Sequence, residues 1–272
     1  MPKKEKGMRE NIRIRASSFG ELMDCPERWK CKHLLGMRLP TSGAARLGTA
    51  VHAGASLFDQ SRLDEKPLTI DDCAGAVVDV IYGKDEEVDW EDSTPNEAEK
   101  IAVPLHKLYC EQIAPKQEYA AVEALCRDLV FTDLGITLTG TVDRVRVTED
   151  GLGIADIKTG KTAVGADGTV KTQGHAAQIA VYELLASQEL GVSIDAPAQI
   201  IGLQVAKTDK GRRAGIGEIQ DARQLLLGEE DKPGLLELAS NMVKSGNFYG
   251  NPKSQICNPK YCPAFQICRW RK

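Results

Sequence analysis

The stretch ITLTGTVDRVRVTEDGLGIADIKTGK, residues 136–161, contains two β-rich runs separated by the turn signal at residues 149–151. Because side chains on a strand alternate between its two faces, Asp156 and Lys158 would point to one side while the residues beside them point into packing. An anion and a cation would therefore share one site on an otherwise apolar strand. Burying such charges costs on the order of several kcal/mol per ion, which favours a functional interpretation.

The first run adds a second carboxylate, Asp143, which a hairpin would bring beside Asp156. Two carboxylates at the end of adjacent strands can hold a hard divalent cation such as Mg2+. Lys158 would lie beside the ion, where it could orient or deprotonate a water molecule or stabilise charge on a phosphate. The implied chemistry is metal-assisted hydrolysis of a phosphodiester. On spacing alone, a structural ion pair between Lys158 and Asp156 at the rim of the sheet explains the pattern equally well.

The composition is that of a globular protein with one sizeable core, since the 272 residues are 42% apolar and 27% charged. No run approaches the roughly 18 to 20 apolar residues that span a bilayer. No apolar segment follows the basic start of the sequence, so we expect a cytoplasmic protein with no membrane partner. The net charge of −4 gives no overall basic field, and contact with nucleic acid would depend on local patches such as residues 207–213.

Residues 16–115 have mostly helical patterns. Ser17 or Ser18 would cap a first short helix, and Pro26 would start a fresh turn. A capping box at residues 94–97 opens the last helix of this part. The longer helices are expected at residues 44–60, 70–82 and 95–113.

Residues 116–220 are richer in strand patterns, beginning with an antiparallel meander. The apolar strand at 198–207 follows a helix at 175–190, and this strand, crossover helix and strand suggest that 198–207 joins the same sheet in parallel. The expected strands are 118–131, 136–147, 151–158, 198–207 and 215–220.

The sequence therefore supports one α/β domain over residues 16–246, closed by a helix at 221–246. A basic tail, residues 1–15, would precede it. A cysteine-rich tail, residues 247–272, would follow and pack on the N-terminal helix.

Four motifs occur in order along the chain: RLGTAVH at 46–52, GTVDRVRV at 140–147, GLGIADIK at 151–158 and QIAVYELL at 178–185. Together they resemble the RecB-type branch of the PD-(D/E)XK nuclease superfamily, over roughly residues 16–268. The resemblance implies a restriction-endonuclease-like core, in which helices flank a mixed central sheet.

The resemblance also implies Mg2+ or Mn2+ as the catalytic cofactor. Glu123 could add a carboxylate for a second metal ion, although a solvated strand face is the interpretation we favour for it. The implied ligands are His52, Asp143, Asp156 and the main-chain carbonyl of Ile157.

By the same resemblance, Lys158 would serve the attacking water. Gln178 and Tyr182, one helical turn apart, would face the active site and help to place Lys158 or the DNA backbone. Basic patches would supply phosphate contacts, although each residue taken singly is better explained as a solvated surface charge. These patches include Arg28, Lys30, Lys32 and the 207–213 loop.

Eight cysteines without a secretion signal argue against a disulfide framework. Three of them lie in apolar-periodic segments, where a small buried hydrophobe is the expected role. Cys257, Cys262 and Cys268, by contrast, lie in an irregular tail with little core of its own. Thiolates at such short spacings ligate zinc or an iron–sulfur cluster. The three in apolar segments are Cys73, Cys110 and Cys126.

The chain is similar to RecB-type nucleases with an iron–sulfur cluster, such as AddB nuclease domains, which implies a 4Fe-4S cluster with Cys25 as the ligand upstream of the three tail cysteines. The cluster would tie the tail to the first helix. The chain departs from the family in one spacing, because four residues separate Cys257 from Cys262 where the family usually has two. Cys31 is a competing ligand, and a four-thiolate zinc site and free buried thiols are the alternatives.

We expect a metal-dependent exonuclease that processes DNA ends, duplex or single-stranded, in recombination or repair, in a bacterial cell or encoded by a phage. No G-x-x-x-x-G-K-[ST] motor motif is present, so unwinding would require a helicase or a single-strand annealing partner. An oligomer that encloses DNA would add processivity. The alternatives are the stand-alone nuclease of CRISPR adaptation, a non-catalytic DNA-end binding protein and a zinc-stapled interaction module.

Overall fold

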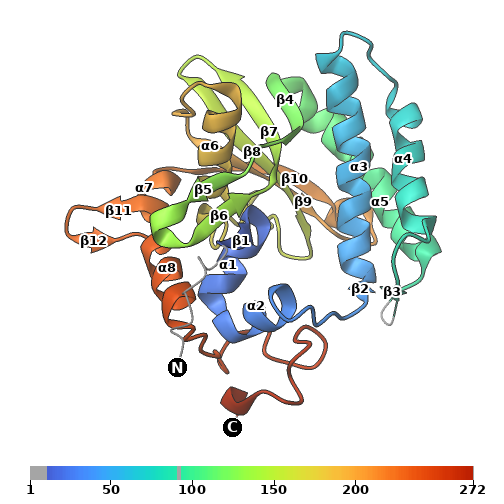
Figure 1. Ribbon diagram of the computed structural model, residues 1–272. Helices are drawn as coiled ribbons and strands as arrows, with labels where there is room; N and C mark the ends of the chain where they lie inside the picture. The colour runs from blue at the N-terminus through green and yellow to red at the C-terminus, as the bar shows by residue number, and fades with distance from the viewer. Residues whose placement is uncertain (1–10, 91–92, 272) are drawn as a thin grey trace, which may run out of the picture.

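A computed structural model describes residues 11–90 and 93–271 of the chain, and Figure 1 shows a central sheet with helices on both faces. The predicted α/β class and the mixed sheet flanked by helices are therefore confirmed. The helices are α1 (Ala16–Asp24), α2 (Pro26–His33), α3 (Gly43–Leu63), α4 (Ile70–Tyr82), α5 (Pro95–Gln112), α6 (Ala176–Leu190), α7 (Ala222–Leu227) and α8 (Leu235–Ser245).

The main sheet has the strand order β10-β9-β8-β7-β4. Strands β7 and β8 form the expected antiparallel hairpin, and β9 returns through α6 to pair with β8 in parallel, as predicted. A smaller sheet has the order β1-β6-β5. The strands of these two sheets are β1 (Ile12–Arg15), β4 (Tyr119–Leu125), β5 (Leu129–Phe131), β6 (Ile136–Thr139), β7 (Thr141–Thr148), β8 (Gly151–Gly160), β9 (Ala198–Gln204) and β10 (Arg213–Ile219).

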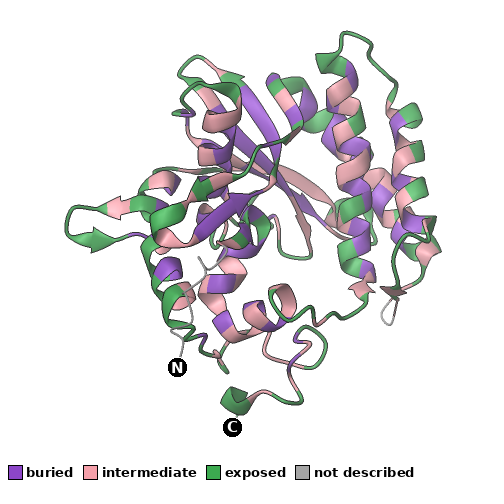
Figure 2. Cartoon of the chain, viewed as in Figure 1, coloured by how far each residue is buried: buried purple, intermediate pink, exposed green. Residues whose placement is uncertain are grey.

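Two hydrophobic cores lie on opposite faces of the main sheet. One is built by α3, α4 and α5 with residues such as Ile157 and Ile201, and the other by α1, α6, α7 and α8 with residues such as Ile154 and Ile200. Figure 2 shows the central strands of the main sheet, β7, β8 and β9, largely buried between these layers. Polar side chains on β7 and β8 are consequently shielded from water on both sides of the sheet. Electrostatic interactions between such side chains are stronger than in water because the local dielectric constant is low.

Helix starts follow the sequence signals in part. The capping box at Thr94 is present, and Pro26 is the first residue of α2. The predicted cap at Ser17 or Ser18 is wrong, because β1 pairs with β6 as far as Arg15 and the helix begins directly after it. The hydroxyl of Ser18 instead donates to the Arg15 carbonyl, at 3.0 Å.

Two predicted strands are each divided in the structure. Residues 118–131 form β4 and β5, and residues 136–147 form β6 and β7, which belong to different sheets. The second break falls at Gly140, where a Cβ would lie 3.3 Å from Leu185 and 3.4 Å from the Ala16 Cβ. A glycine here lets the chain pass between α1 and α6 while it changes sheet.

The predicted terminal segments also differ. Residues 12–15 of the expected basic tail form β1, while residues 1–10 lie outside the described residues. The expected helix at 221–246 is divided into α7 and α8, because Gly228 adopts a φ of +85° and the chain turns back in a short hairpin there. This hairpin pairs β11 (Gly228–Glu229) with β12 (Lys232–Pro233), and a further short pair joins β2 (Thr41–Ser42) to β3 (Val88–Asp89).

The C-terminal tail lies against α1 and α2. The Asp24 carboxylate accepts a hydrogen bond from Ser254, at 2.6 Å, and the side chain of Asn251 donates to the Asp24 carbonyl, at 3.1 Å. Trp29, which is fully buried, stacks on Phe248 with ring centroids 6.3 Å apart. Within the described ranges, no helix has both the length and the apolar character needed to cross a membrane.

Candidate metal and catalytic site

The β7–β8 hairpin brings the two predicted aspartates together. Asp143 and Asp156 are 4% and 2% exposed. The Asp143 Oδ2 accepts the main-chain N–H of Ile157, at 2.8 Å, which joins the carboxylate of one strand to the backbone of the other. A buried carboxylate tied to the backbone in this way cannot rotate freely, so Asp143 presents its remaining lone pairs in a fixed direction.

Helix α3 supplies His52 to the same point. Its Nδ1 lies 3.3 Å from the Asp143 Oδ1, and its Nε2 lies 2.9 Å from the Ile157 carbonyl oxygen, so that Nε2–H donates and Nδ1 faces the carboxylates. The close approach of α3 to β8 requires Gly48, because a Cβ at this position would lie 2.7 Å from the Thr159 Oγ1. This contact explains the glycine of the RLGTAVH motif in physical terms.

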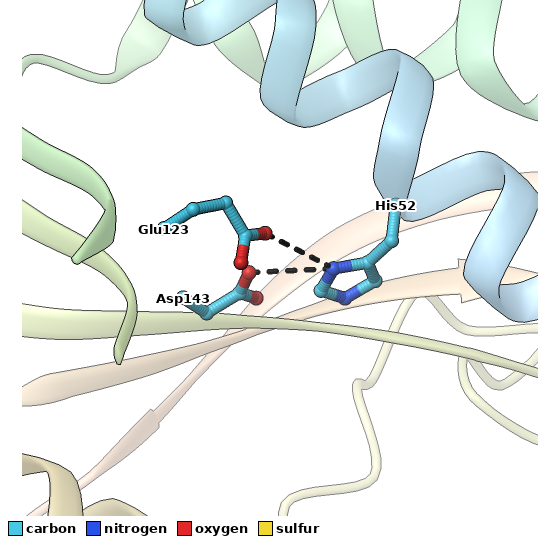
Figure 3. Close-up of side chains that lie close together, drawn as sticks. All are labelled: His52, Glu123 and Asp143. Atoms are coloured by element: carbon cyan, nitrogen blue, oxygen red, sulfur yellow. Dashed lines mark ion pairs between the residues drawn. The ribbon is translucent and has the colours of Figure 1, made fainter. Parts of the chain in front are cut away.

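Glu123 lies at the site, although we favoured a solvated strand face for it. It lies on β4 with a φ of +47°, a backbone conformation that few non-glycine residues adopt. Its Oε1 is 3.9 Å from the His52 Nδ1 (Figure 3). The same oxygen accepts a hydrogen bond from the Ser56 hydroxyl, at 2.7 Å. The unusual backbone thus accompanies a carboxylate aimed at a functional site, as strained residues often do.

His52, Glu123 and Asp143 each offer one ligand atom, and these atoms all lie within 4.8 Å of one another. Carboxylate oxygens with one imidazole nitrogen suit Mg2+ or Mn2+. Mn2+ is the softer of the two ions, so it accepts the ring nitrogen more readily. The donor set therefore fits a divalent cation. Asp156, on the neighbouring strand, is paired with Lys158 and lies outside this group of three.

Lys158 is held by two polar groups. Its Nζ lies 2.7 Å from the Asp156 Oδ2 and donates to the Gln178 Oε1, at 3.0 Å. The Gln178 Nε2 in turn donates to the Tyr182 hydroxyl, at 2.9 Å, and to the Asp156 Oδ1, at 3.3 Å. Gln178 and Tyr182, one turn apart on α6, thus both face the hairpin, as expected from their spacing.

The electrostatics of the site separate the two aspartates. Burial alone would raise the pKa of Asp143, but the charges of His52 and Arg144 hold that pKa below its ordinary value. Burial raises the pKa of Asp156, and the neighbouring Asp143 adds to the increase, which the Lys158 ion pair only partly offsets. Burial would lower the pKa of His52, yet the Asp143 carboxylate and the contact with Glu123 leave it raised. Such divergence between adjacent groups is typical of catalytic sites.

The four cysteines singled out in the sequence line a single pocket. Cys25 comes from the end of α1, and Cys257, Cys262 and Cys268 come from the tail. Cys31 does not line this pocket and packs in a small apolar cluster with Cys262 and Ala264. In the part of the chain that the structure describes, no three thiols come within 4.8 Å of one another. The three scattered cysteines are buried, as predicted, and they are Cys73, Cys110 and Cys126.

Most of the basic residues proposed for phosphate contacts already have partners within the chain. Arg28 and Lys32 pair with Glu21, at 2.8 and 3.1 Å, and Lys30 pairs with Glu27, at 2.9 Å. In the 207–213 loop, Lys207 pairs with Glu97, Arg212 with Asp209, and Arg213 donates to the Val164 carbonyl. These partners support the structural interpretation of each charge taken singly.

Sequence alone did not identify Ser56, Asp59 or Arg144, which surround the carboxylates. Arg144 is fully buried and pairs with Asp59, at 2.7 Å. Two signals were available. An arginine directly follows Asp143 in a strand whose other members are mostly valines and threonines, and Ser56 and Asp59 stand four and seven residues after His52, on the same face of a helix.

The comparison with protein families agrees with this geometry. A family model described as the PD-(D/E)XK nuclease superfamily matches residues 13–269. No curated protein matches the chain. The match covers nearly the whole sequence, including the hairpin, α3 and α6 that build the site. The chain therefore belongs to the PD-(D/E)XK nuclease superfamily.

Proposed function

We propose that this protein is a Mg2+- or Mn2+-dependent deoxyribonuclease that hydrolyses DNA from its ends. The observation that carries the proposal is the convergence of His52, Glu123 and Asp143 within 4.8 Å beside the Asp156–Lys158 pair. The carboxylates and the imidazole can hold a divalent cation, and that cation together with the Lys158 ammonium would stabilise a negatively charged phosphoryl transition state.

The cation would be held by the His52 imidazole and the Asp143 carboxylate, with Asp156 and the Ile157 carbonyl beside them, and Glu123 is the further carboxylate within reach. When bound, such an ion polarises the phosphate and lowers the pKa of a water ligand. The protein keeps the two aspartates apart from bulk water and in place, because Asp143 and Asp156 are both buried and hydrogen bonded.

Lys158 would act on the reacting atoms directly. Its side chain is 29% exposed, so the ammonium group can reach a bound phosphate without leaving Asp156. We assign to it the stabilisation of charge on the phosphate oxygens and the orientation of the attacking water. Gln178 would hold the Lys158 ammonium through its amide oxygen, and the Tyr182 hydroxyl would support that amide with a further hydrogen bond.

We further propose that the four cysteines of the tail pocket hold a 4Fe-4S cluster. A four-thiolate zinc site would need sulfur atoms about 3.8 Å apart, given a Zn–S distance of about 2.3 Å in a tetrahedron. Among the described residues no three thiols lie within 4.8 Å of one another, although four of them line one pocket, and this arrangement favours a larger group. Such a cluster would join the tail to α1 as a structural element, and reduced thiols fit the cytoplasm.

The biological role that we propose is the processing of DNA ends in recombination or repair, with a helicase or a single-strand annealing protein as partner. Degradation from ends requires a free terminus, so the two forms of one plasmid provide the test. Linear DNA should be degraded in Mg2+ or Mn2+, and the closed circle should persist.

The decisive experiment uses anaerobically purified protein, linear and closed circular DNA, and two lysine variants. Lys158→Ala should lower the cleavage rate by at least about 100-fold, which corresponds to the loss of an electrostatic contact made in the transition state. Lys244→Ala, an exposed lysine on α8, is the matched control and should cleave at the wild-type rate. Cleavage of the closed circle would show that the protein is an endonuclease and not an exonuclease. Equal inertness of wild type and Lys158→Ala, with DNA still bound, would leave only a DNA-binding role.

A further inference from the structure

Arg144 is a charged side chain next to the candidate site that has no exposed surface. A buried guanidinium is costly unless its donors are paired, so its partners indicate its purpose. Its Nη1 lies 2.8 Å from the Asp143 Oδ1, its Nε lies 2.7 Å from the Asp59 Oδ2, and its Nη2 donates to the Ser56 Oγ, at 3.4 Å. Three nitrogens of one planar group thus engage three different residues.

The Ser56 contact extends this arrangement to the second carboxylate of the site. The Ser56 Oγ accepts from Arg144 and donates to the Glu123 Oε1, at 2.7 Å. Arg144 therefore contacts Asp143 directly and Glu123 through one hydroxyl group. The same guanidinium therefore orients both carboxylates that converge on His52.

Helix α3 supplies the fixed points of this network. His52, Ser56 and Asp59 are spaced by four and three residues, so their side chains project from one face of the helix. Asp59 is 1% exposed and also accepts a hydrogen bond from the Tyr109 hydroxyl. The guanidinium carbon of Arg144 also lies over the rings of Tyr109 and Tyr119, 5.7 and 5.8 Å from the two centroids. The position of the guanidinium is consequently defined on every side.

We infer that Arg144 is a positioning residue that aligns both carboxylates of the metal site, Asp143 directly and Glu123 through Ser56, with Asp59 as its anchor. The inference rests on the proposed function, because it assigns a purpose to groups behind the proposed ligands. Neither Arg144 nor Ser56 contacts the DNA or the cation in this scheme. Lysine cannot replace Arg144, since its single ammonium group lacks the planar fork that reaches three acceptors.

The test measures binding of Mn2+ alone to the full-length protein by electron paramagnetic resonance, in which bound and free Mn2+ give different signals. Removal of groups behind metal ligands typically costs 10- to 100-fold in metal affinity. Ser56→Ala should therefore weaken Mn2+ binding about 10-fold, and Arg144→Lys at least as much. Ser56→Thr retains the hydroxyl and is the matched control, expected within twofold of wild type.

Ser56 is only partly buried, so Ser56→Ala gives a folded protein even if Arg144→Lys does not. DNA binding in EDTA should be unchanged in Ser56→Ala, because the network faces the metal ligands. Mn2+ affinities within twofold of wild type for both Ser56→Ala and Arg144→Lys would overturn the inference. If the wild-type protein binds Mn2+ but cleaves no DNA, the proposed function fails. The positioning inference is then still decided by the Mn2+ affinities of the variants. Absence of Mn2+ binding by wild type would overturn both.

Discussion

The amide of Gln178 links the Lys158 ammonium to the Asp156 carboxylate. One side chain can do this because an amide offers an acceptor and two donors. Its oxygen accepts from Lys158, while its nitrogen donates to Asp156 and to the Tyr182 hydroxyl. Lys158 can only donate and the Asp156 carboxylate can only accept, so these two groups determine which end of the amide faces Lys158. The Tyr182 hydroxyl adds one more hydrogen bond that holds the amide in place.

Gln178→Ala should lower the single-turnover cleavage rate by about 10- to 100-fold, because Lys158 loses the group that holds it, and small displacements of a catalytic group cost up to about 100-fold. Tyr182→Phe should have a smaller effect, since it leaves the Gln178–Lys158 hydrogen bond in place. Cleavage rates measured at saturating metal, together with melting temperatures, separate a lost contact from lost folding. A Gln178→Ala rate equal to that of wild type would show that Lys158 is held in another way.

Glu183, the residue after Tyr182, contacts Arg223 on α7 at 3.9 Å and not the site. Burial raises its pKa from 4.5 to about 7, against the opposing charge of Arg223 and with support from Asp195 and Asp221. A carboxyl whose pKa is higher in the folded state contributes stability below pH 4.5, and this contribution is lost as the pH rises through 7. The full loss corresponds to roughly 3 kcal/mol.

Glu183→Gln, which cannot ionise, should therefore be more stable than wild type at pH 8 and lose that advantage at pH 5. Urea denaturation at both pH values gives the free energy of unfolding, and the difference between the two proteins isolates this residue from other titrating groups. A constant difference between the variants across the pH range would contradict the assignment.

At the scale of elements, the contact between α3 and β8 sets the distance from His52 to the hairpin. Gly48 permits it, because a Cβ there would lie 2.7 Å from the Thr159 Oγ1. Alanine is intrinsically preferred over glycine in a helix by about 1 kcal/mol, so a purely local effect would stabilise α3. The expected steric effect has the opposite sign, which makes the substitution informative.

Gly48→Ala should lower both the melting temperature and the cleavage rate, the latter by about 10-fold or more, because displacement of α3 moves His52 away from Asp143. Gly48→Ala combined with Thr159→Ala removes the clashing hydroxyl and should recover most of the activity. Thermal melts and cleavage assays on the two single variants and the double variant form the complete cycle. An active, stabilised Gly48→Ala protein would show that the approach is not limiting.

Much of this element arrangement follows from local signals. The α4 bounds, the capping box at Thr94 and the parallel return of β9 were predictable, because periodicity and capping act within a few residues. The division of residues 136–147 at Gly140 was not, since it depends on α1 and α6 packing from distant parts of the sequence. The position of Glu123 at the candidate site was also not predictable, because it depends on a left-handed φ of +47° that glutamate rarely adopts.

At the scale of the whole molecule, α1 joins the tail to the part of the molecule that carries the candidate site. Asn251 and Ser254 bond to Asp24 at the end of α1, and α1 packs against α6, the helix that carries Gln178 and Tyr182. Cys25 directly follows Asp24 and its sulfur accepts the main-chain N–H of Asn251, at 3.4 Å. The proposed cluster would therefore reinforce a connection that side-chain hydrogen bonds already make.

Cys25 and Cys31 provide a matched pair for this proposal, since both are buried and only six positions apart, yet only Cys25 lines the pocket of the tail cysteines. Cys25→Ser should lose most of the bound iron and the visible absorption of the anaerobically purified protein, and its tail should become sensitive to proteolysis. Cys31→Ser should retain both the iron and the protected tail. Because Asn251 and Ser254 still hold the tail to Asp24, we expect Cys25→Ser to remain folded and to keep part of its cleavage activity. If instead Cys31→Ser loses the metal and Cys25→Ser keeps it, the ligand assignment is wrong. If the wild-type protein contains one mole of zinc per chain, the site holds a single zinc ion and not a cluster.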